Sequence, residues 1–424
     1  MAHNTPTTCC SRATNGAGAF ACAACGHTNC LLHAALWTDS RRRCRLCFGA
    51  CIPVTSSAST PLLASTSAIG ARSQVVLVLD GLYVAGAQRH CLELLKVLGR
   101  RGMSRVVIAL EGGGRWADRF LAESEHLIVG DGTPFGWSHI QDLIPGVSPA
   151  IVSAHLMCAV EWAASNLADA PPRFAHLHCE PSEHEPVTAA WMHRHLPRFH
   201  SIFVPARSTL GALTSLLPTN DPLRGKFRVL PNSLQAEAEV PAHTDSQPRE
   251  LRIGAVSRID DDKFSVPVFL GACDSLNEQR VDFEVQLAGD GELLPELKDA
   301  IGRRSWGQRV RFRGFVDDVS AIYNWADVVF IPSKRESAPY VLLEALALRR
   351  PVVGPATGVL TELGGSELVF LFAPGDACAA ADAILKAKIP TAARGHRGTT
   401  GSLPSMAVPE YPDWERMVWE AYGR

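Results

Sequence analysis

The 424-residue chain has the composition of an ordinary globular protein, with 46% hydrophobic and 20% charged residues. It is long enough for about two or three domains, and its net charge of −2 gives no electrostatic support for a nucleic-acid partner. Its longest apolar runs are too short to cross a bilayer, and its first residues lack a secretory pattern, so we expect a cytoplasmic protein with at most peripheral membrane contact.

Cysteines are concentrated near the start, where eight of the thirteen lie before residue 52. Two Cys-x2-Cys pairs in this region have the spacing of tetrahedral zinc sites. We therefore predict that residues 1–52 form a small module with one or two structural zinc ions, which docks a protein partner. The predicted ligands are Cys22, Cys25, Cys30, His33, Cys44 and Cys47.

Residues 53–73 are rich in Ser, Ala and Thr, which predicts a flexible linker. From Gln74 onward, apolar runs of strand length alternate with amphipathic segments such as residues 88–101. This alternation predicts a parallel sheet with crossover helices over residues 74–235. The expected strands are residues 75–79, 106–110, 150–153, 174–177, 201–204 and 227–230.

A polar segment at residues 235–249 precedes a second alternation over residues 250–388. The expected strands are residues 251–256, 283–287, 310–312, 328–331 and 351–353. Two such units joined by a polar segment predict an α/β fold of two Rossmann-like domains that face each other across a cleft. Residues 409–424 contain a final amphipathic helix.

Two glutamates, Glu336 and Glu344, lie eight positions apart around Pro339, between a predicted strand and the helix that follows it. Ligands of open α/β sheets bind at such strand-to-helix junctions, and a helix N-terminus offers free N–H groups to phosphate. The pair could therefore hold the hydroxyls of a phosphorylated sugar ligand. The alternative is an exposed loop glutamate and a second one on the wet edge of an amphipathic helix.

Arg258 and Lys263 follow the first strand of the second unit, where a diphosphate could be gripped. They could equally pair with the aspartates between them. Gly289 lies in a Gly-Asp-Gly turn after the next strand, which either lets backbone approach a nucleotide or is an ordinary turn.

Four segments of the second unit, in their order along the chain, resemble the retaining glycosyltransferases of family 4, which have the GT-B fold. The segments are VSRIDDDK, LAGDGELLPELK, VRFRGFVDDVSAIYNWADVVFIPSKRES and APYVLLEALALRRPVVGPATGVLTEL. The resemblance covers roughly residues 74–424 and is most specific over residues 251–365. The sequence departs from the family at Phe264, which replaces a usual glycine, and at Arg349 and Arg350 before Pro351.

The resemblance implies a role for each of these residues. Arg258 and Lys263 would hold the donor diphosphate, Glu344 would bond the ribose hydroxyls, and Glu336 would approach the transferred sugar. Backbone after Pro339, at Tyr340 and Val341, would meet phosphate and sugar oxygens, and Gly289 would also lie on the donor side.

In the first unit, the turn around Gly86 resembles the glycine-rich turn of the family and would bring N–H groups to the ligand. His155 follows one strand, and alternation places His176 and His178 on one face of another. The resemblance makes His178 the candidate catalytic histidine near the sugar, where it could donate a hydrogen bond to a donor hydroxyl or to the leaving oxygen. The alternative is a satisfied structural histidine. The closing helix would pack back on the first domain.

The resemblance implies a retaining glycosyltransferase that uses a nucleotide-sugar donor, a glycan or other hydroxyl acceptor, and no catalytic metal, since cations would neutralise the diphosphate. Two alternatives remain: a sugar-nucleotide epimerase of the same architecture, and a non-catalytic sugar-nucleotide-binding adaptor whose output is the zinc module.

Overall fold

The computed structural model describes the backbone of four short strands before residue 66 and, with side chains, most of the chain from residue 74 onward. The second part comprises residues 74–130, 149–166, 171–180, 187–233, 250–261, 263–388 and 411–422. Three of the short strands, β1 (Ala19–Cys22), β2 (Thr28–Cys30) and β3 (Cys51–Val54), form an antiparallel sheet in the order β2-β1-β3. The side chains of all six predicted zinc ligands lie outside the described residues, so the zinc site stays a prediction.

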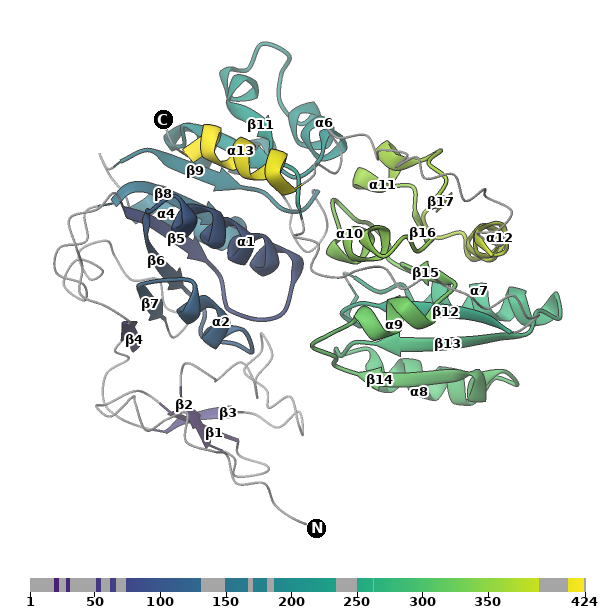
Figure 1. The fold of residues 1–424 in the computed structure, drawn as a ribbon. Coiled ribbons are helices and arrows are strands. Elements are labelled where there is room, and N and C mark those ends of the chain that lie inside the picture. The colour runs from purple at the N-terminus through teal and green to yellow at the C-terminus, as the bar shows by residue number, and fades with distance from the viewer. Residues whose placement is uncertain are drawn as a thin grey trace.

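The first unit is built on a sheet in the order β11-β10-β9-β8-β5-β6-β7-β4 (Figure 1). Its strands are parallel except the edge strand β4 (Leu62–Ser65), which pairs antiparallel with β7. The parallel strands are β5 (Gln74–Leu79), β6 (Ser104–Ala109), β7 (His126–Val129), β8 (Pro149–His155), β9 (Arg173–His176), β10 (Ser201–Val204) and β11 (Phe227–Val229). Its helices are α1 (Gly86–Arg100), α2 (Ala117–Ala122), α4 (Met157–Asn166), α5 (Ala189–His195) and α6 (Arg207–Ser215), with short 3-10 turns at Leu196–Arg198 and Pro222–Lys226.

Strand β4 lies inside the segment that we predicted to be a flexible linker. Its four residues pair with His126–Val129, so this part of the predicted linker extends the first sheet. An edge strand can pair with a sheet through backbone hydrogen bonds alone, whatever its side chains are. The Ser- and Ala-rich composition of this segment therefore gave no indication of β4.

The second unit is a parallel sheet in the order β14-β13-β12-β15-β16-β17. Its strands are β12 (Leu251–Val256), β13 (Phe283–Ala288), β14 (Val310–Gly314), β15 (Val328–Phe330), β16 (Val352–Pro355) and β17 (Val369–Phe372). Its helices are α7 (Val266–Glu278), α8 (Leu294–Gly302), α9 (Ser320–Trp325), α10 (Tyr340–Ala347), α11 (Gly358–Leu363) and α12 (Ala377–Ala387), with a 3-10 turn at Gly307–Arg309. The prediction of an α/β fold with two parallel sheets is confirmed.

Both sheets are covered on two faces, which explains why their strands are almost continuously apolar. In β5, for example, Val75, Leu77 and Leu79 enter one core cluster, while Val76 and Val78 enter the cluster on the opposite face. In each sheet, successive strands are added toward one edge and then toward the other. The change occurs between β5 and β8 in the first sheet and between β12 and β15 in the second. Ligands of open parallel sheets bind at the carboxyl ends of the strands beside such a change.

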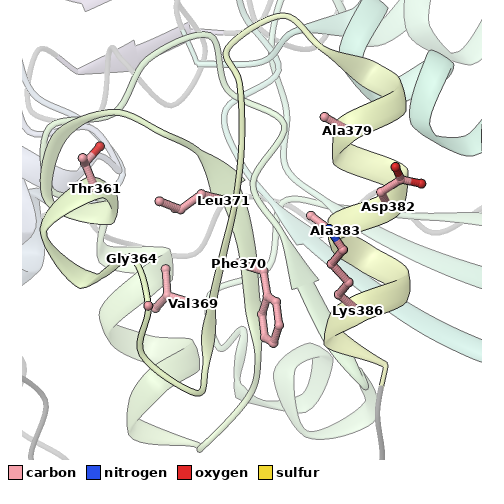
Figure 2. Close-up of a pocket in the computed structure, with 10 residues that line it drawn as sticks. Thr361, Gly364, Val369, Phe370, Leu371, Ala379, Asp382, Ala383 and Lys386 are labelled. Atoms are coloured by element: carbon pink, nitrogen blue, oxygen red, sulfur yellow. The ribbon is translucent and has the colours of Figure 1, made fainter.

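A pocket of about 530 Å³ lies at the β17 edge of the second sheet, between α11 and α12 (Figure 2). Thr361, Leu371 and Lys386 are among the residues that line it. None of the predicted site residues lines this pocket, so it is separate from the site considered below.

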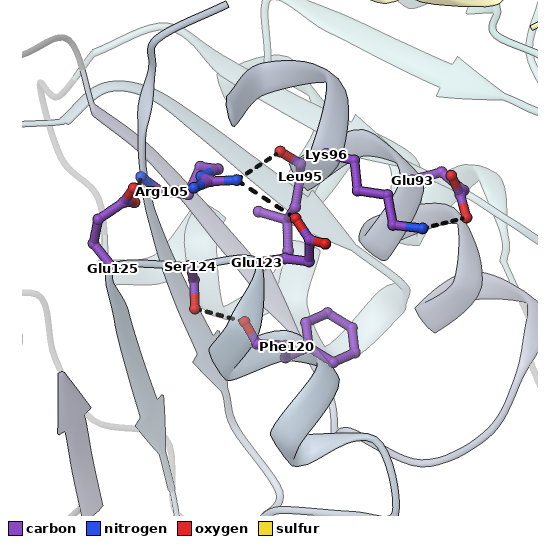
Figure 3. Close-up of polar contacts among 8 residues, drawn as sticks. All are labelled: Glu93, Leu95, Lys96, Arg105, Phe120, Glu123, Ser124 and Glu125. Carbon is purple, nitrogen blue, oxygen red and sulfur yellow. Dashed lines mark hydrogen bonds and ion pairs between the residues drawn. The ribbon is translucent and has the colours of Figure 1, made fainter. Parts of the chain in front are cut away.

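Arg105 on β6 fixes helix α1 against the sheet (Figure 3). Its guanidinium donates to the carbonyl oxygen of Leu95 at 3.3 Å and to Glu125 at 3.0 Å. Gly99 makes room for it, because a Cβ there would lie 2.1 Å from an Arg105 nitrogen. On the next turns of α1, buried Glu93 pairs with Lys96 and with Arg89, each at 3.3 Å. Arg105 therefore holds the C-terminal half of α1 on the sheet, and the two ion pairs of Glu93 lie within α1 itself.

Helix α13 (Tyr411–Tyr422) follows the second unit in sequence but packs on the first, beside α1 (Figure 1, yellow). Trp414, Val418 and Tyr422 recur at helical spacing and are buried in the core cluster that also contains β5 and α1 side chains. The Trp414 indole donates to the carbonyl oxygen of Pro231 at 2.7 Å. Of the helices that the structure describes, none combines the length and the apolar character that a membrane span requires.

Candidate functional site

The segments that follow the strands of the two sheets meet at the interface between the units. The Asn232 amide, after β11, donates to the carbonyl oxygen of Ala338 at 2.8 Å. The backbone N–H of Glu180, after β9, donates to the Ser337 hydroxyl at 2.8 Å. Ser208 at the start of α6 donates to Glu362 from its backbone N–H, at 2.8 Å. The loop before α10 is therefore bonded directly to the loops of the first unit.

Ser333 joins two of the predicted donor-side residues. Its hydroxyl is fully buried and lies 2.7 Å from a carboxylate oxygen of Glu336 and 3.1 Å from the carbonyl oxygen of Lys263. The backbone N–H of Glu336 also donates to the Thr357 hydroxyl at 2.9 Å. The half-buried Glu336 carboxylate is thus fixed beside the segment that carries Lys263.

Arg258 and Lys263 lie on one loop, which Asp260 organises. Asp260 accepts a hydrogen bond from the Lys263 backbone at 2.8 Å and pairs with the Arg258 guanidinium at 3.4 Å. Asp261 pairs with the exposed Lys334. For Arg258 the structure shows the alternative, pairing with a neighbouring aspartate, while the phosphate grip stays a prediction. An exposed ion pair of this kind is weak and exchanges readily for a stronger anionic ligand.

Two glycines are required by the close approach of these loops. Gly289 has φ of +145°, and a Cβ on it would lie 1.8 Å from the Ser257 carbonyl oxygen. Gly358 has φ of +53°, and a Cβ there would lie 1.9 Å from the Glu336 carbonyl oxygen. Gly289 thus packs its turn onto the loop after β12, and Gly358 packs the start of α11 onto the Glu336 loop.

Glu344 lies half-buried on α10 and accepts a hydrogen bond of 2.8 Å from the buried Tyr323 hydroxyl. Burial raises the pKa of its carboxyl, although the Tyr323 hydrogen bond and the charge of Arg89 in the first unit oppose the rise. Arg89 lies in the first turn of α1, so this opposing charge comes from the first unit.

The starts of α1 and α10 also adjoin. Gly86 is exposed, and a Cβ on it would lie 3.6 Å from the ring of Tyr340. The hydroxyl of buried Tyr340 is without a hydrogen-bond partner among the described residues. Pro339 is the N-cap of α10 and provides no side-chain cap, so the first N–H groups of the helix, including Val341, are left for another acceptor.

Four histidines form a cluster in the first unit. His155, His176 and His178 stack with ring centroids 4.1–5.9 Å apart and interplanar angles of 16–20°. The His90 ring packs 5.1 Å from that of His178, edge to face. Burial lowers the pKa of His90 to about 4 and lowers the pKa of the other three well below its usual range, so all four imidazoles are neutral at neutral pH.

The cluster is better suited to hydrogen bonding than to metal coordination. Ring nitrogens of His90, His155 and His176 lie within 4.8 Å of one another, as a metal site requires. However, His155 and His176 stack almost parallel, so their in-plane lone pairs do not converge on one point. Both nitrogens of His155 already have hydrogen-bond partners, Ser153 at 2.9 Å and His178 at 3.1 Å.

The structure thus brings predicted residues together in three groups. Lys263 and Glu336 meet through Ser333, while Gly86 and Tyr340 meet where α1 and α10 adjoin, with Glu344 one turn further along α10. His155 and His178 are bonded to each other. Sequence reasoning assigned no role to Arg89, His90, Asn232, Ser333 and Tyr422. Arg89 and His90 directly follow the turn that contains Gly86, which was the available signal.

Two Rossmann-like units, with the loops after their strands bonded to one another, define the architecture of GT-B enzymes, and solved structures bear this out. A glycosyltransferase from Rickettsia africae aligns with a TM-score of 0.62 at 15% identity, over 83% of this chain and 98% of its own. The structure of Anabaena Alr3699/HepE in complex with UDP and glucose aligns with a TM-score of 0.62 at 17% identity, over 82% and 94%.

The second unit is also recognised in sequence. Residues 250–387 match the family model described as glycosyl transferases group 1. Alpha-D-kanosaminyltransferase of Streptomyces kanamyceticus is 32% identical over 111 residues, which are 26% of this chain and 28% of that protein. The amylovoran biosynthesis glycosyltransferase AmsK of Erwinia amylovora is 31% identical over 151 residues, 34% of this chain and 37% of that one. The matched segments thus cover well under half of these relatives, and together with the fold they support an enzyme of the glycosyltransferase type.

Proposed function

We propose that this chain is a retaining glycosyltransferase that moves a sugar from a nucleotide-diphosphate donor to a hydroxyl group of a glycan, lipid or small-molecule acceptor. The observation that carries the proposal is the loop before α10. Ser333 joins Glu336 to the Lys263 segment there, and Ser337 accepts a hydrogen bond from Glu180, two residues after His178. Glu336 and the Lys263 segment of the second unit, and the segment that follows His178 in the first unit, are therefore bonded to one loop.

The donor diphosphate would be neutralised by cations and by a helix end. Arg258 and Lys263 supply positive charge, and the uncapped start of α10 supplies backbone N–H groups at Tyr340 and Val341. The turn at Gly289, which has no side chain, would let backbone approach the nucleotide. The likeness to a chain solved with UDP and glucose favours a nucleotide donor of this kind.

The ribose would bind at Glu344. An ionised carboxylate offers about four acceptor positions, of which the Tyr323 hydroxyl takes one, so positions remain for the two ribose hydroxyls. The positive charge of Arg89 nearby favours the ionised form that such acceptance requires.

In the transfer step, the bond between the anomeric carbon and the diphosphate oxygen breaks, and its electron pair leaves with the diphosphate. The acceptor oxygen bonds to the anomeric carbon on the face that the diphosphate leaves, and its proton passes to a diphosphate oxygen. Neutral His178 would donate a hydrogen bond to the sugar or to the leaving oxygen, and Glu336 would orient the sugar. We propose that no catalytic metal takes part and that zinc is confined to residues 1–52.

Neither alternative has a specific observation in its favour. An epimerase would need acid and base carboxylates in the first unit, and the clustered titratable groups described there are neutral histidines. A binding adaptor would hold the donor without turnover, and the test below distinguishes it.

The test is a screen of nucleotide-diphosphate sugars by nucleotide release, with and without hydroxyl acceptors. We expect one donor to release its nucleotide, and to do so faster when the acceptor is present. Adding a chelator should not abolish this release. Lys263→Ala should lower turnover, while Lys334→Ala, which removes an exposed cation of the neighbouring loop, serves as the matched control. Donor binding without release of nucleotide under any condition would contradict transfer and support the adaptor.

A further inference from the structure

We propose that Tyr422 on helix α13 is a positioning residue that sets which ring nitrogen of His178 carries the proton. The kinetic consequence and the choice between two proton arrangements rest on the proposed function, while the hydrogen-bond contacts themselves do not. Tyr422 is 1% exposed, and its hydroxyl lies 2.6 Å from the Ser153 hydroxyl and 2.6 Å from Nε2 of His176.

These contacts continue without a break to His178. The Ser153 hydroxyl lies 2.9 Å from Nε2 of His155, and Nδ1 of His155 lies 3.1 Å from Nε2 of His178. The distances are those of ordinary hydrogen bonds. A chain of hydrogen bonds therefore runs from His176 through Tyr422, Ser153 and His155 to His178, and we name it the histidine relay.

The relay has only two proton arrangements while its imidazoles are neutral. Each hydroxyl has one proton to donate, and each neutral imidazole has one N–H. If Tyr422 donates to His176, Ser153 must donate to Tyr422, and the remaining bonds leave the His178 proton on Nε2. If Tyr422 donates to Ser153 instead, every bond reverses, and the His178 proton is on Nδ1.

Burial keeps charge out of this choice. Burial lowers the pKa of His155, His176 and His178 well below its usual range, and nearby imidazoles lower it further. Burial and nearby charge raise the pKa of Cys91, and burial raises that of Tyr422, so these groups are also neutral. The relay thus changes its tautomer and not its charge.

His90 is fixed independently of the relay. The Asn232 side chain uses its NH2 group to donate to the Ala338 carbonyl oxygen, so its oxygen, 3.0 Å from Nδ1 of His90, is an acceptor. His90 therefore carries its proton on Nδ1, and it does not supply a competing donor to His178 through that nitrogen.

Only one of the two arrangements suits the proposed step. The relay uses Nε2 of His178, so Nδ1 is the nitrogen that takes no part in it. Nδ1 can donate to the sugar or to the leaving oxygen only when it carries the proton. We assign the arrangement in which His176 donates to Tyr422, Tyr422 to Ser153, Ser153 to His155, and His155 to His178. Without the Tyr422 hydroxyl, the proton of His176 no longer fixes the direction of the Ser153 and His155 bonds, and the Nε2–H form of His178 is no longer disfavoured.

The test compares Tyr422→Phe with Val418→Ala in the full-length protein. Val418 is a fully buried neighbour on the same helix, so its truncation weakens packing without touching the relay. For Tyr422→Phe we expect kcat to fall about tenfold, the effect of one misplaced hydrogen bond, with the donor KM changed by less than about twofold. Val418→Ala should lower thermal stability at least as much and leave kcat unchanged.

Two further measurements separate positioning from packing. In the Ser153→Ala background the relay is already broken, so adding Tyr422→Phe should change kcat little more. Nitrogen NMR of histidine-labelled protein should show His178 as the Nδ1–H tautomer, shifting toward Nε2–H in Tyr422→Phe but not in Val418→Ala. An unchanged His178 tautomer, or additive effects of the two substitutions, overturns the proposal. If the parent protein turns over no donor, the proposed function fails, and the NMR measurement still decides the relay.

Discussion

Replacing Glu344 by glutamine tests the donor site with little disturbance of the fold. The amide oxygen can still accept the Tyr323 hydrogen bond, so the buried hydroxyl keeps a partner. The change removes the charge that the ribose hydroxyls would meet, and a hydrogen bond to a charged group is worth about 1.5–3 kcal/mol. We therefore expect the dissociation constant for UDP, measured by calorimetry, to rise roughly 10- to 150-fold.

The same substitution should not destabilise the unliganded protein. Because burial raises the pKa of Glu344 above its ordinary value, the folded state binds this proton more tightly than the unfolded state does. The contribution to stability is therefore present at low pH and is lost as pH rises through the raised pKa. At neutral pH the ionised carboxyl opposes folding, so glutamine should leave the thermal midpoint unchanged or higher.

Tyr323→Phe is the matched control, because it removes the hydroxyl partner of Glu344 and keeps the charge. It should weaken UDP binding less than Glu344→Gln does. A folded Glu344→Gln protein that binds UDP within roughly twofold of the parent would remove Glu344 from the donor site and refute the reasoning.

Three other outcomes are expected. UDP affinity should fall as pH drops toward the raised pKa of Glu344. In Glu344→Gln, measured over the same pH range, the only pH dependence left should be that of the UDP phosphates. Arg258→Ala and Lys263→Ala should each cut turnover roughly tenfold or more, whereas Lys334→Ala should not. A chelator should leave turnover unchanged, and a requirement for added magnesium would contradict this. A fragment of residues 1–54 should fold only with one or two bound zinc ions by metal analysis, and a chain that begins at residue 56, and so keeps β4, should bind UDP.

Most of the parallel strands were predictable because they are short apolar runs, but β7 (His126–Val129) and β17 (Val369–Phe372) were not predicted. Ser201–Val204 and Leu251–Val256 have the bounds that the sequence predicted. Other elements differ by a residue or two at their ends, as for α1, which begins at Gly86 and not at residue 88. Boundaries depend on capping and loop contacts, which apolar periodicity does not record.

The site was predictable only where its members are close in sequence. Glu336 and Glu344 flank one helix start, so a single stretch contained both. The bond between Asn232 and Ala338 joins residues 106 positions apart, and the bond between Ser153 and Tyr422 joins residues 269 apart. Neither pairing has a local signature, because each depends on how two units and a returning helix pack.

Helix α13 makes the first unit discontinuous in sequence. If the chain were cut after residue 235, the surface that Trp414 and Val418 cover would face water, and Ser153 and His176 would lose the hydroxyl that bridges them. The core clusters of the second unit consist almost wholly of residues 251–387. No helix from elsewhere in the described chain completes them as α13 completes the core of the first unit. The two units therefore differ as folding modules: the second is contiguous in sequence, whereas the first is complete only with a helix from the far end of the chain.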